Sequence, residues 1–331
     1  MTRWMVRFLA LGLLLTTQAG HADKLERLVI TGPPAAVSFP LVHMVESGAL
    51  DDLAEEVEFQ HWRDPDQLRV MALGGQAQVL AMPTNVAANL YNRGAELELL
   101  NVSTWGVLWL VTRDGSLETL TDLRDKEIAM PFRADMPDIL FQALAREQGL
   151  NPRKDFNLRY VGSPLDAMQL LIMRRVDHAL LAEPAVSMAL RRTDSFPIRL
   201  ISPELHRGVD LQQEWGRVFE REARVPQAGI TVMGAALDKP ELSGRIQSAY
   251  RDSLQWCRQN AEECGRTVAS HLDMLMPEAV SDAIAVSKLE AVPATEARAE
   301  LEFFYELLMQ DSPELVGGKL PDGGFYSNEK P

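Results

Sequence analysis

Short apolar runs alternate with amphipathic stretches along the first third of the chain, which is the pattern of strands separated by helices. Gly or Pro punctuates most of the changes from one element to the next. The pattern predicts strands at 28–30, 57–61 and 96–102, helices at 38–46 and 67–73, and a strand–helix unit around 80–90. This βαβαβ order indicates an α/β unit whose strands are mainly parallel.

The same alternation continues after residue 106 and predicts a second α/β unit. Its expected strands are 107–112, 127–130 and 158–161, and its expected helices are a short turn-like one at 120–126 and longer ones at 135–148 and 164–173. Residues 200–220 look irregular and carry Trp215. After a strand at 229–233 the pattern is almost entirely helical, with helices at about 240–259, 261–274, 277–286 and 294–309, and the Gly- and Pro-rich tail from Val316 is expected to be loose or on the surface.

A four-residue signal occurs once in each unit. Leu80-Ala81-Met82-Pro83 and Leu181-Ala182-Glu183-Pro184 each end an apolar run and precede residues at helical spacing. Proline suits the first turn of a helix, so each copy predicts a buried strand, a tight junction and a helix. Two similar α/β units predict a cleft between them, because ligands of open α/β sheets bind at the carboxyl ends of strands.

The first 22 residues have the features of a secretory signal peptide. Arg3 and Arg7 give a positive start, residues 8–15 are apolar, and Gly20-His21-Ala22 supplies small residues for cleavage after Ala22. The apolar run is too short to span a bilayer, which needs about 18 residues. The sequence therefore predicts export, with the bacterial periplasm as the best fit.

The charge balance argues against some partners. The formal charge of −14 becomes −16 once Arg3 and Arg7 are removed with the leader. Nucleic acids and anionic membranes are bound mainly through cationic side chains, so neither is expected as a partner.

Cys257 and Cys264 are the two cysteines of the chain. On one unbroken helix their Cα atoms would lie about 10 Å apart, too far for a disulfide. Asn260 with Glu263 resembles a helix N-cap with its capping box, and a bend there would bring the sulfurs together. The sequence therefore allows either a disulfide or two reduced thiols. Because no histidine lies close by, the two cysteines do not predict a metal site.

Two stretches of the second unit resemble a known family. Residues 122–129 (Asp-Leu-Arg-Asp-Lys-Glu-Ile-Ala) and the run from Asp166-Ala167 through Val176-Asp177 to Glu183-Pro184 resemble motifs of periplasmic solute-binding proteins of ABC transporters, of the nitrate, sulfonate and taurine type. That fold is shared with thiamine-pyrimidine synthase-like proteins. The chain departs from the pattern at Asp125 and Arg174, where glycine is usual, at His178, where alanine is usual, and at Gln78, where the family often has Asp.

The resemblance implies a two-lobed type II periplasmic-binding-protein fold with a helical C-terminal region. Lobe one would comprise 23–104 plus 230–331 and lobe two 107–226, with hinge crossings near 103–106 and 225–229. Such a protein, expected to be a monomer without a cofactor, closes around a small molecule by hinge motion and delivers it to an inner-membrane ABC permease.

The candidate ligand-binding residues are those expected at strand ends facing the cleft: Pro33, Pro34, Ser38, Pro83, Thr84, Asn85, Ser103, Thr104, Trp105, Phe132, Arg133, Asp135, Glu183, Gln227 and Ala228.

Several of these candidates have two readings. Thr84, Asn85 and Asp135 suit helix caps as well as ligand contact, and Trp105 suits stacking on a ligand or packing at the hinge. Arg133 could pair with a carboxylate or sulfonate. Glu183 could accept a hydrogen bond from a ligand amine or from backbone groups of its own loop, because a buried carboxylate needs a partner. Together they favour a small planar organic compound, with a sulfonate or carboxylate as the alternative.

Two other functions compete with transport. An enzyme of the thiamine-pyrimidine synthase-like group is disfavoured by the leader, by the scattered histidines, and by the lack of G-x-S-x-G, G-x-G-x-x-G, P-loop and H-E-x-x-H motifs. His178 lies in an apolar run and suits a satisfied core position. A periplasmic sensor or carrier that is not tied to a permease stays open.

Overall fold

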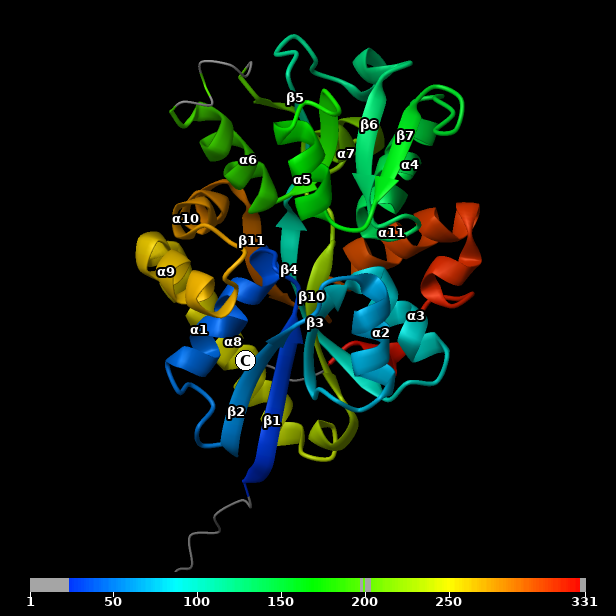
Figure 1. Ribbon diagram of the computed structural model, residues 1–331. Helices are drawn as coiled ribbons and strands as arrows, with labels where there is room; N and C mark the ends of the chain where they lie inside the picture. The colour runs from blue at the N-terminus through cyan, green and yellow to red at the C-terminus, as the bar shows by residue number, and fades with distance from the viewer. Residues whose placement is uncertain (1–23, 197–198, 200–203, 328–331) are drawn as a thin grey trace, which may run out of the picture.

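Two mixed sheets organise the chain. The computed structural model describes residues 24–196, 199 and 204–327, so the predicted signal peptide lies outside the described residues. The first sheet has six strands in the order β11-β4-β10-β3-β1-β2, and the second has five in the order β7-β6-β8-β5-β9. We refer to the six-stranded half and the five-stranded half, each being one sheet with its covering helices (Figure 1).

The elements of the six-stranded half come from both ends of the chain. Its strands are β1 (Leu25–Gly32), β2 (Ala54–His61), β3 (Val79–Pro83), β4 (Leu97–Gly106), β10 (Ala228–Met233) and β11 (Lys288–Pro293). Its α-helices are α1 (Phe39–Glu46), α2 (Pro65–Leu73), α3 (Thr84–Asn92), α8 (Pro240–Gln259), α9 (Ala261–His271), α10 (Pro277–Val286) and α11 (Arg298–Asp311). Short 3-10 turns are η1 (Ala36–Ser38), η4 (Gly234–Ala236), η5 (Pro313–Val316) and η6 (Gly323–Phe325).

The five-stranded half is one continuous stretch. Its strands are β5 (Leu108–Thr112), β6 (Glu127–Pro131), β7 (Asn157–Val161), β8 (His178–Ala182) and β9 (His206–Asp210). Its helices are η2 (Leu120–Leu123), α4 (Met136–Glu147), α5 (Pro164–Ile172), α6 (Ala185–Asp194) and α7 (Leu211–Phe219). Both repeated signals therefore form the predicted strand–helix junctions, β3 to α3 and β8 to α6.

Both sheets are mixed and contain parallel as well as antiparallel pairs. β1 pairs in parallel with β2 and β3, and β6 with β7 and β8, but β10 is antiparallel to β3 and β4. β5 is likewise antiparallel to β8 and β9. The cause is the connection between the halves, because β4 leads out of the first sheet and β10 leads back into it as the neighbouring strand.

Three local predictions were wrong. Residues 200–220, expected to be irregular, contain β9 and α7, whose first turn is capped by the Asp210 carboxylate accepting from the amides of Gln212 and Gln213. Residues 288–293 form the edge strand β11 inside the expected helical region. The C-terminal tail is packed rather than loose, because Phe325 is fully buried and Tyr326 bridges to Leu99 of β4.

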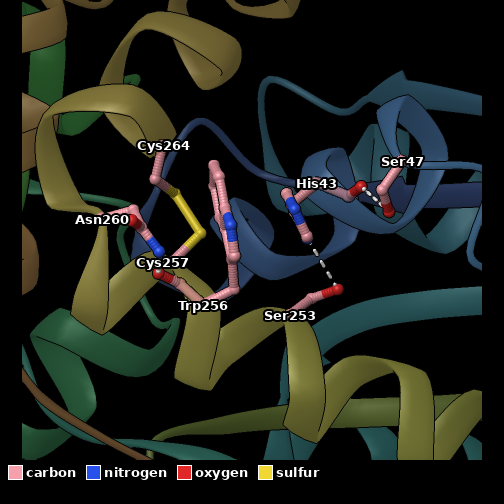
Figure 2. Close-up of a disulfide and its surroundings, with 7 residues drawn as sticks. All are labelled: His43, Ser47, Ser253, Trp256, Cys257, Asn260 and Cys264. Carbon is pink, nitrogen blue, oxygen red and sulfur yellow. Dashed lines mark hydrogen bonds between the residues drawn. A yellow bond between two sulfur atoms is a disulfide. The ribbon is translucent and has the colours of Figure 1, made fainter.

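Cys257 and Cys264 form a disulfide at the junction of α8 and α9, which decides between the two sequence alternatives (Figure 2). The chain bends at Asn260, and the two Cα atoms lie 5.1 Å apart. Asn260 occupies the predicted N-cap position of α9, but its side chain does not cap that helix and instead donates to the Trp256 carbonyl of the preceding helix. Trp256 in turn stacks on His43 of α1 with ring centroids 4.0 Å apart, which joins the bend to the core.

His178 occupies a satisfied core position, as the sequence predicted. Its Nδ1 lies 2.8 Å from the Thr112 hydroxyl, and burial lowers the pKa of the imidazole. Within the described part of the chain no helix is long and apolar enough to span a bilayer.

Candidate functional site

A cavity of about 340 Å³ lies where the two halves face each other. Its walls come from the ends of β3, β4, β6, β8 and β10 and from the first turns of α2, α4 and α5, so the repeated junctions are brought together there. Its volume is in the usual range for a small-molecule site. Most of the lining side chains are apolar, and they include Trp62, Leu68, Met82, Val107, Phe132 and Leu165.

Eight of the predicted ligand-binding residues line this cavity, as does Ala228. They are Pro33, Pro34, Pro83, Thr104, Phe132, Asp135, Glu183 and Gln227. The clearest sequence signal for them was the end of a predicted strand, which is where the cleft-facing residues of an α/β sheet lie.

Three other candidates are buried behind the lining. The Ser38 hydroxyl donates to the Pro33 carbonyl at 2.6 Å, and the Thr84 hydroxyl donates to the Pro226 carbonyl at 2.5 Å. Asn85 is buried in the first turn of α3 and does not line the cavity. Their positions at predicted element ends were correct, but the local turns direct these side chains into the protein.

Trp105 packs at the junction of the halves, away from the cavity. Its indole Nε1 donates to the carbonyl of Glu290 at 2.9 Å, and the Arg224 guanidinium lies 4.2 Å above its ring. Ser103 is also fully buried and away from the cavity. Arg133 faces an outer hollow, where its guanidinium lies over the Tyr160 ring at 5.2 Å. Residues 132–134 turn sharply, and this carries Arg133 outward while its neighbour Phe132 faces the cavity.

Phe132 is held in an unusual backbone conformation. Its φ is 54°, and Ala134 two residues later has a φ of 60°. Side chains with a Cβ rarely adopt this left-handed region, and each such residue costs roughly 1 kcal/mol or more. The loop between β6 and α4 thus holds an aromatic ring at the cavity wall against a local energetic preference.

Glu183 is fully buried, and both of its carboxylate oxygens have partners within its own half. Oε1 accepts from Arg207 Nη2 at 2.8 Å, and Oε2 accepts from the Ser187 amide at 3.1 Å. Arg207 also donates to the Ser187 hydroxyl at 2.9 Å. Sequence reasoning missed Arg207 because it lies on β9, in the stretch that looked irregular.

Asp135 carries an ion pair across the cleft. Its Oδ1 caps the Met136 amide of α4, while Oδ2 lies 2.9 Å from Arg69 Nη2 on α2 of the other half. Burial raises the pKa of the Asp135 carboxyl above its usual value, and the facing Arg69 guanidinium partly opposes this. The predicted cap is therefore present, together with a contact between halves that the sequence did not indicate.

Further ion pairs join the halves outside the cavity. Arg191 of α6 binds both carboxylate oxygens of Asp282 on α10, at 2.5 and 2.8 Å, and Arg146 of α4 pairs with Asp311 at the end of α11. Figure 1 shows α10 beneath α6 and α11 beneath α4, on opposite flanks of the molecule. The halves are thus connected by polar contacts on both flanks and within the cleft.

The described residues contain no group of three or more His, Cys, Asp or Glu side chains arranged to hold a metal ion. The cavity has mainly apolar walls and a few polar groups.

Comparison with known structures shows the same fold. An ABC transporter protein from Parabacteroides distasonis has a TM-score of 0.72 at 23% identity, covering 93% of this chain and 100% of that one. The periplasmic aliphatic sulphonate binding protein SsuA from Escherichia coli has a TM-score of 0.66 at 15% identity, with 92% and 93% covered. The periplasmic nitrate-binding protein NrtA from Synechocystis has a TM-score of 0.67 at 14% identity, with 88% and 84% covered.

The sequence itself matches one family over more than half of its length. No curated protein sequence gives a significant match. The model of the family described as the ABC transporter, phosphonate, periplasmic substrate-binding protein matches residues 44–232. This stretch contains the repeated junctions, the β4–β5 crossing and the return through β10. The two-lobed binding-protein fold inferred from the resemblance is therefore confirmed, and the chain belongs to the family of phosphonate-type periplasmic substrate-binding proteins of ABC transporters.

Proposed function

We propose that the protein captures a small organic solute in the cavity between its halves and delivers it to an inner-membrane ABC permease. The observation that carries the proposal is the cavity itself, because residues of both halves form its walls and Arg69 meets Asp135 across it. A site built from two bodies can hold its ligand by closure and release it by opening.

The proposed moving bodies are lobe one, 23–104 plus 230–331, and lobe two, 107–226, with the hinge near 103–106 and 225–229. The structural support is that one residue, Val107, separates β4 from β5, and that the return segment bonds to the outgoing one. The Val225 and Gln227 amides donate to the carbonyls of Trp105 and Thr104. Such a short double crossing allows rotation with little sliding.

Export of the chain, cleavage after Ala22 and action as a free periplasmic monomer complete the proposal. The support is the sequence of the first 22 residues and the periplasmic family to which the chain belongs. Mass spectrometry of the protein recovered from periplasm tests the cleavage site directly.

The proposed function is tested by native mass spectrometry of the gently purified periplasmic protein, followed by release and identification of its ligand. Small-angle scattering of the emptied and refilled protein then tests closure. We expect a single bound compound per chain and a smaller radius of gyration when it is bound. An unchanged radius at saturation would contradict hinge closure.

A further inference from the structure

The walls of the cavity contain few groups that could bind an oxyanion. Arg63 is the one cationic side chain among the described lining residues, and it is exposed. Three carboxylates, from Asp135, Asp166 and Glu183, lie in the same lining. A phosphonate or sulfonate placed among them would lose its water and face like charge, which is costly unless donors surround it.

Three of the helix N-termini at the cavity, those of α2, α4 and α5, offer few free amides to an anion. Free amides at such positions commonly bind phosphate-like groups. Here Pro65, Pro137 and Pro164 stand in the first two positions of α2, α4 and α5, and proline has no N–H. Other amides of these first turns are bonded to the chain's own oxygens, for example the Met136 amide to Asp135 and the Asp166 amide to Ser163.

The carboxylates of the lining are themselves mostly satisfied. Glu183 is held by Arg207 and by the Ser187 amide, and Asp135 by Arg69 and the Met136 amide. Their cationic partners are therefore not free to bind a ligand anion without exposing a buried carboxylate. Most of the remaining lining is apolar surface, with Trp62 and Phe132 as its aromatic rings.

One buried hydroxyl of the lining has no partner. Thr104 Oγ1 is buried and has no hydrogen-bond partner among the described residues. A buried hydroxyl of this kind is normally bonded, so its partner is expected from outside the chain.

From these observations we infer that the ligand is a mainly apolar organic molecule without an oxyanion group, whose single polar group bonds to Thr104 and whose body packs against Phe132. This inference rests on the proposed function and narrows its ligand class. The inferred ligand differs from the sulphonate and nitrate anions after which the structural relatives are named.

Two fluorescent dyes with nearly the same ring system test the ligand class. N-phenylnaphthylamine is uncharged, and anilinonaphthalenesulfonate adds one sulfonate to the same rings. Each dye is titrated into the full mature protein, and methylphosphonate, ethanesulfonate and nitrate are then tested as competitors. We expect saturable binding of the uncharged dye, at least about tenfold weaker binding of the sulfonated dye, and no competition by the three anions.

Three variants test whether the dye binds in the cavity. Phe132→Ala should weaken binding of the uncharged dye about tenfold, and Thr104→Val about fivefold through loss of one hydrogen bond. Phe196→Ala is the matched control, because Phe196 is an exposed phenylalanine outside the cavity, and it should leave binding unchanged.

The other outcomes are distinct. If the sulfonated dye binds as tightly as the uncharged one and Phe132→Ala weakens it, or if an anion competes, the ligand class is overturned while the cavity stays the binding site. If neither dye responds to Phe132→Ala, the inferred class is overturned and the proposed binding cavity fails with it.

Discussion

Removal of the Arg207 side chain should destabilise the five-stranded half strongly. In Arg207→Met the Glu183 carboxylate stays fully buried but keeps one partner, the Ser187 amide. Breaking a fully buried ion pair from one side costs roughly 3–5 kcal/mol. Because the Arg207 side chain is 26% exposed, water shields part of the interaction, and we expect about 2–3 kcal/mol of lost unfolding free energy.

The second variant identifies the cause. Glu183→Gln with Arg207→Met removes both charges and keeps an oxygen that can accept from the Ser187 amide. We expect this double variant to lose only about 1 kcal/mol, so that the two single changes are not additive. Arg175→Met, an exposed arginine of the same half, is the control and should stay within about 0.5 kcal/mol of the unchanged protein.

Urea unfolding at neutral pH, followed by both tryptophan fluorescence and circular dichroism, measures these free energies when the two transitions coincide. The argument fails if Arg207→Met behaves like the Arg175→Met control, or if the double variant loses as much as the two single variants together. Either result would mean that the Arg207 side chain does not stabilise the buried Glu183 carboxylate.

Three more predictions follow from the geometry. Because burial raises the pKa of Asp135, the folded chain binds a proton at this group more readily than the unfolded chain does, so the group's contribution to stability falls as the pH rises from near 4 through its folded pKa. Asp135→Asn should remove this decrease in unfolding free energy when urea unfolding is measured between pH 4 and 7. An unchanged dependence of the unfolding free energy on pH would contradict the prediction. Replacing Cys257 and Cys264 by serine should cost roughly 2 kcal/mol of unfolding free energy for a loop of seven residues, and a thermal midpoint that does not move would count against it. A Cβ at Gly229 would lie 1.9 Å from the Asn101 carbonyl oxygen, so Gly229→Ala should lower the thermal midpoint clearly, whereas the control Gly323→Ala, whose Cβ would meet no atom within 4 Å, should leave it nearly unchanged.

Most of the fold could be predicted from local pattern, and the exceptions have physical causes. The β3–α3 and β8–α6 junctions were found because a buried strand followed by proline is a strong local signal. β9 and β11 were missed because they are edge strands with few buried positions, so their alternation is weak. The packed tail was missed because the burial of Phe325 depends on Tyr91 and Tyr305, which are distant in sequence.

The candidate site was only partly predictable for a related reason. Strand ends indicate which residues lie near a cleft, and this placed Phe132, Asp135 and Glu183 correctly at the cavity. The direction of each side chain depends on the turn that follows, which is why neighbouring Arg133 faces outward. The partners Arg69 and Arg207 come from other elements, and pairing of distant elements leaves no local pattern in a single sequence.

The sheet order of the six-stranded half has a consequence for how a nascent chain assembles. All strands of the five-stranded sheet are present once residue 210 has been made, whereas β10 and β11 of the other sheet end at residues 233 and 293. Until then β3 and β4 lack their shared neighbour and expose open edges, which invite pairing with other chains. The six-stranded sheet therefore cannot be completed in the order in which its strands are made, because β10 and β11 follow the whole five-stranded half. A chain interrupted before residue 228 would be the most prone to aggregate.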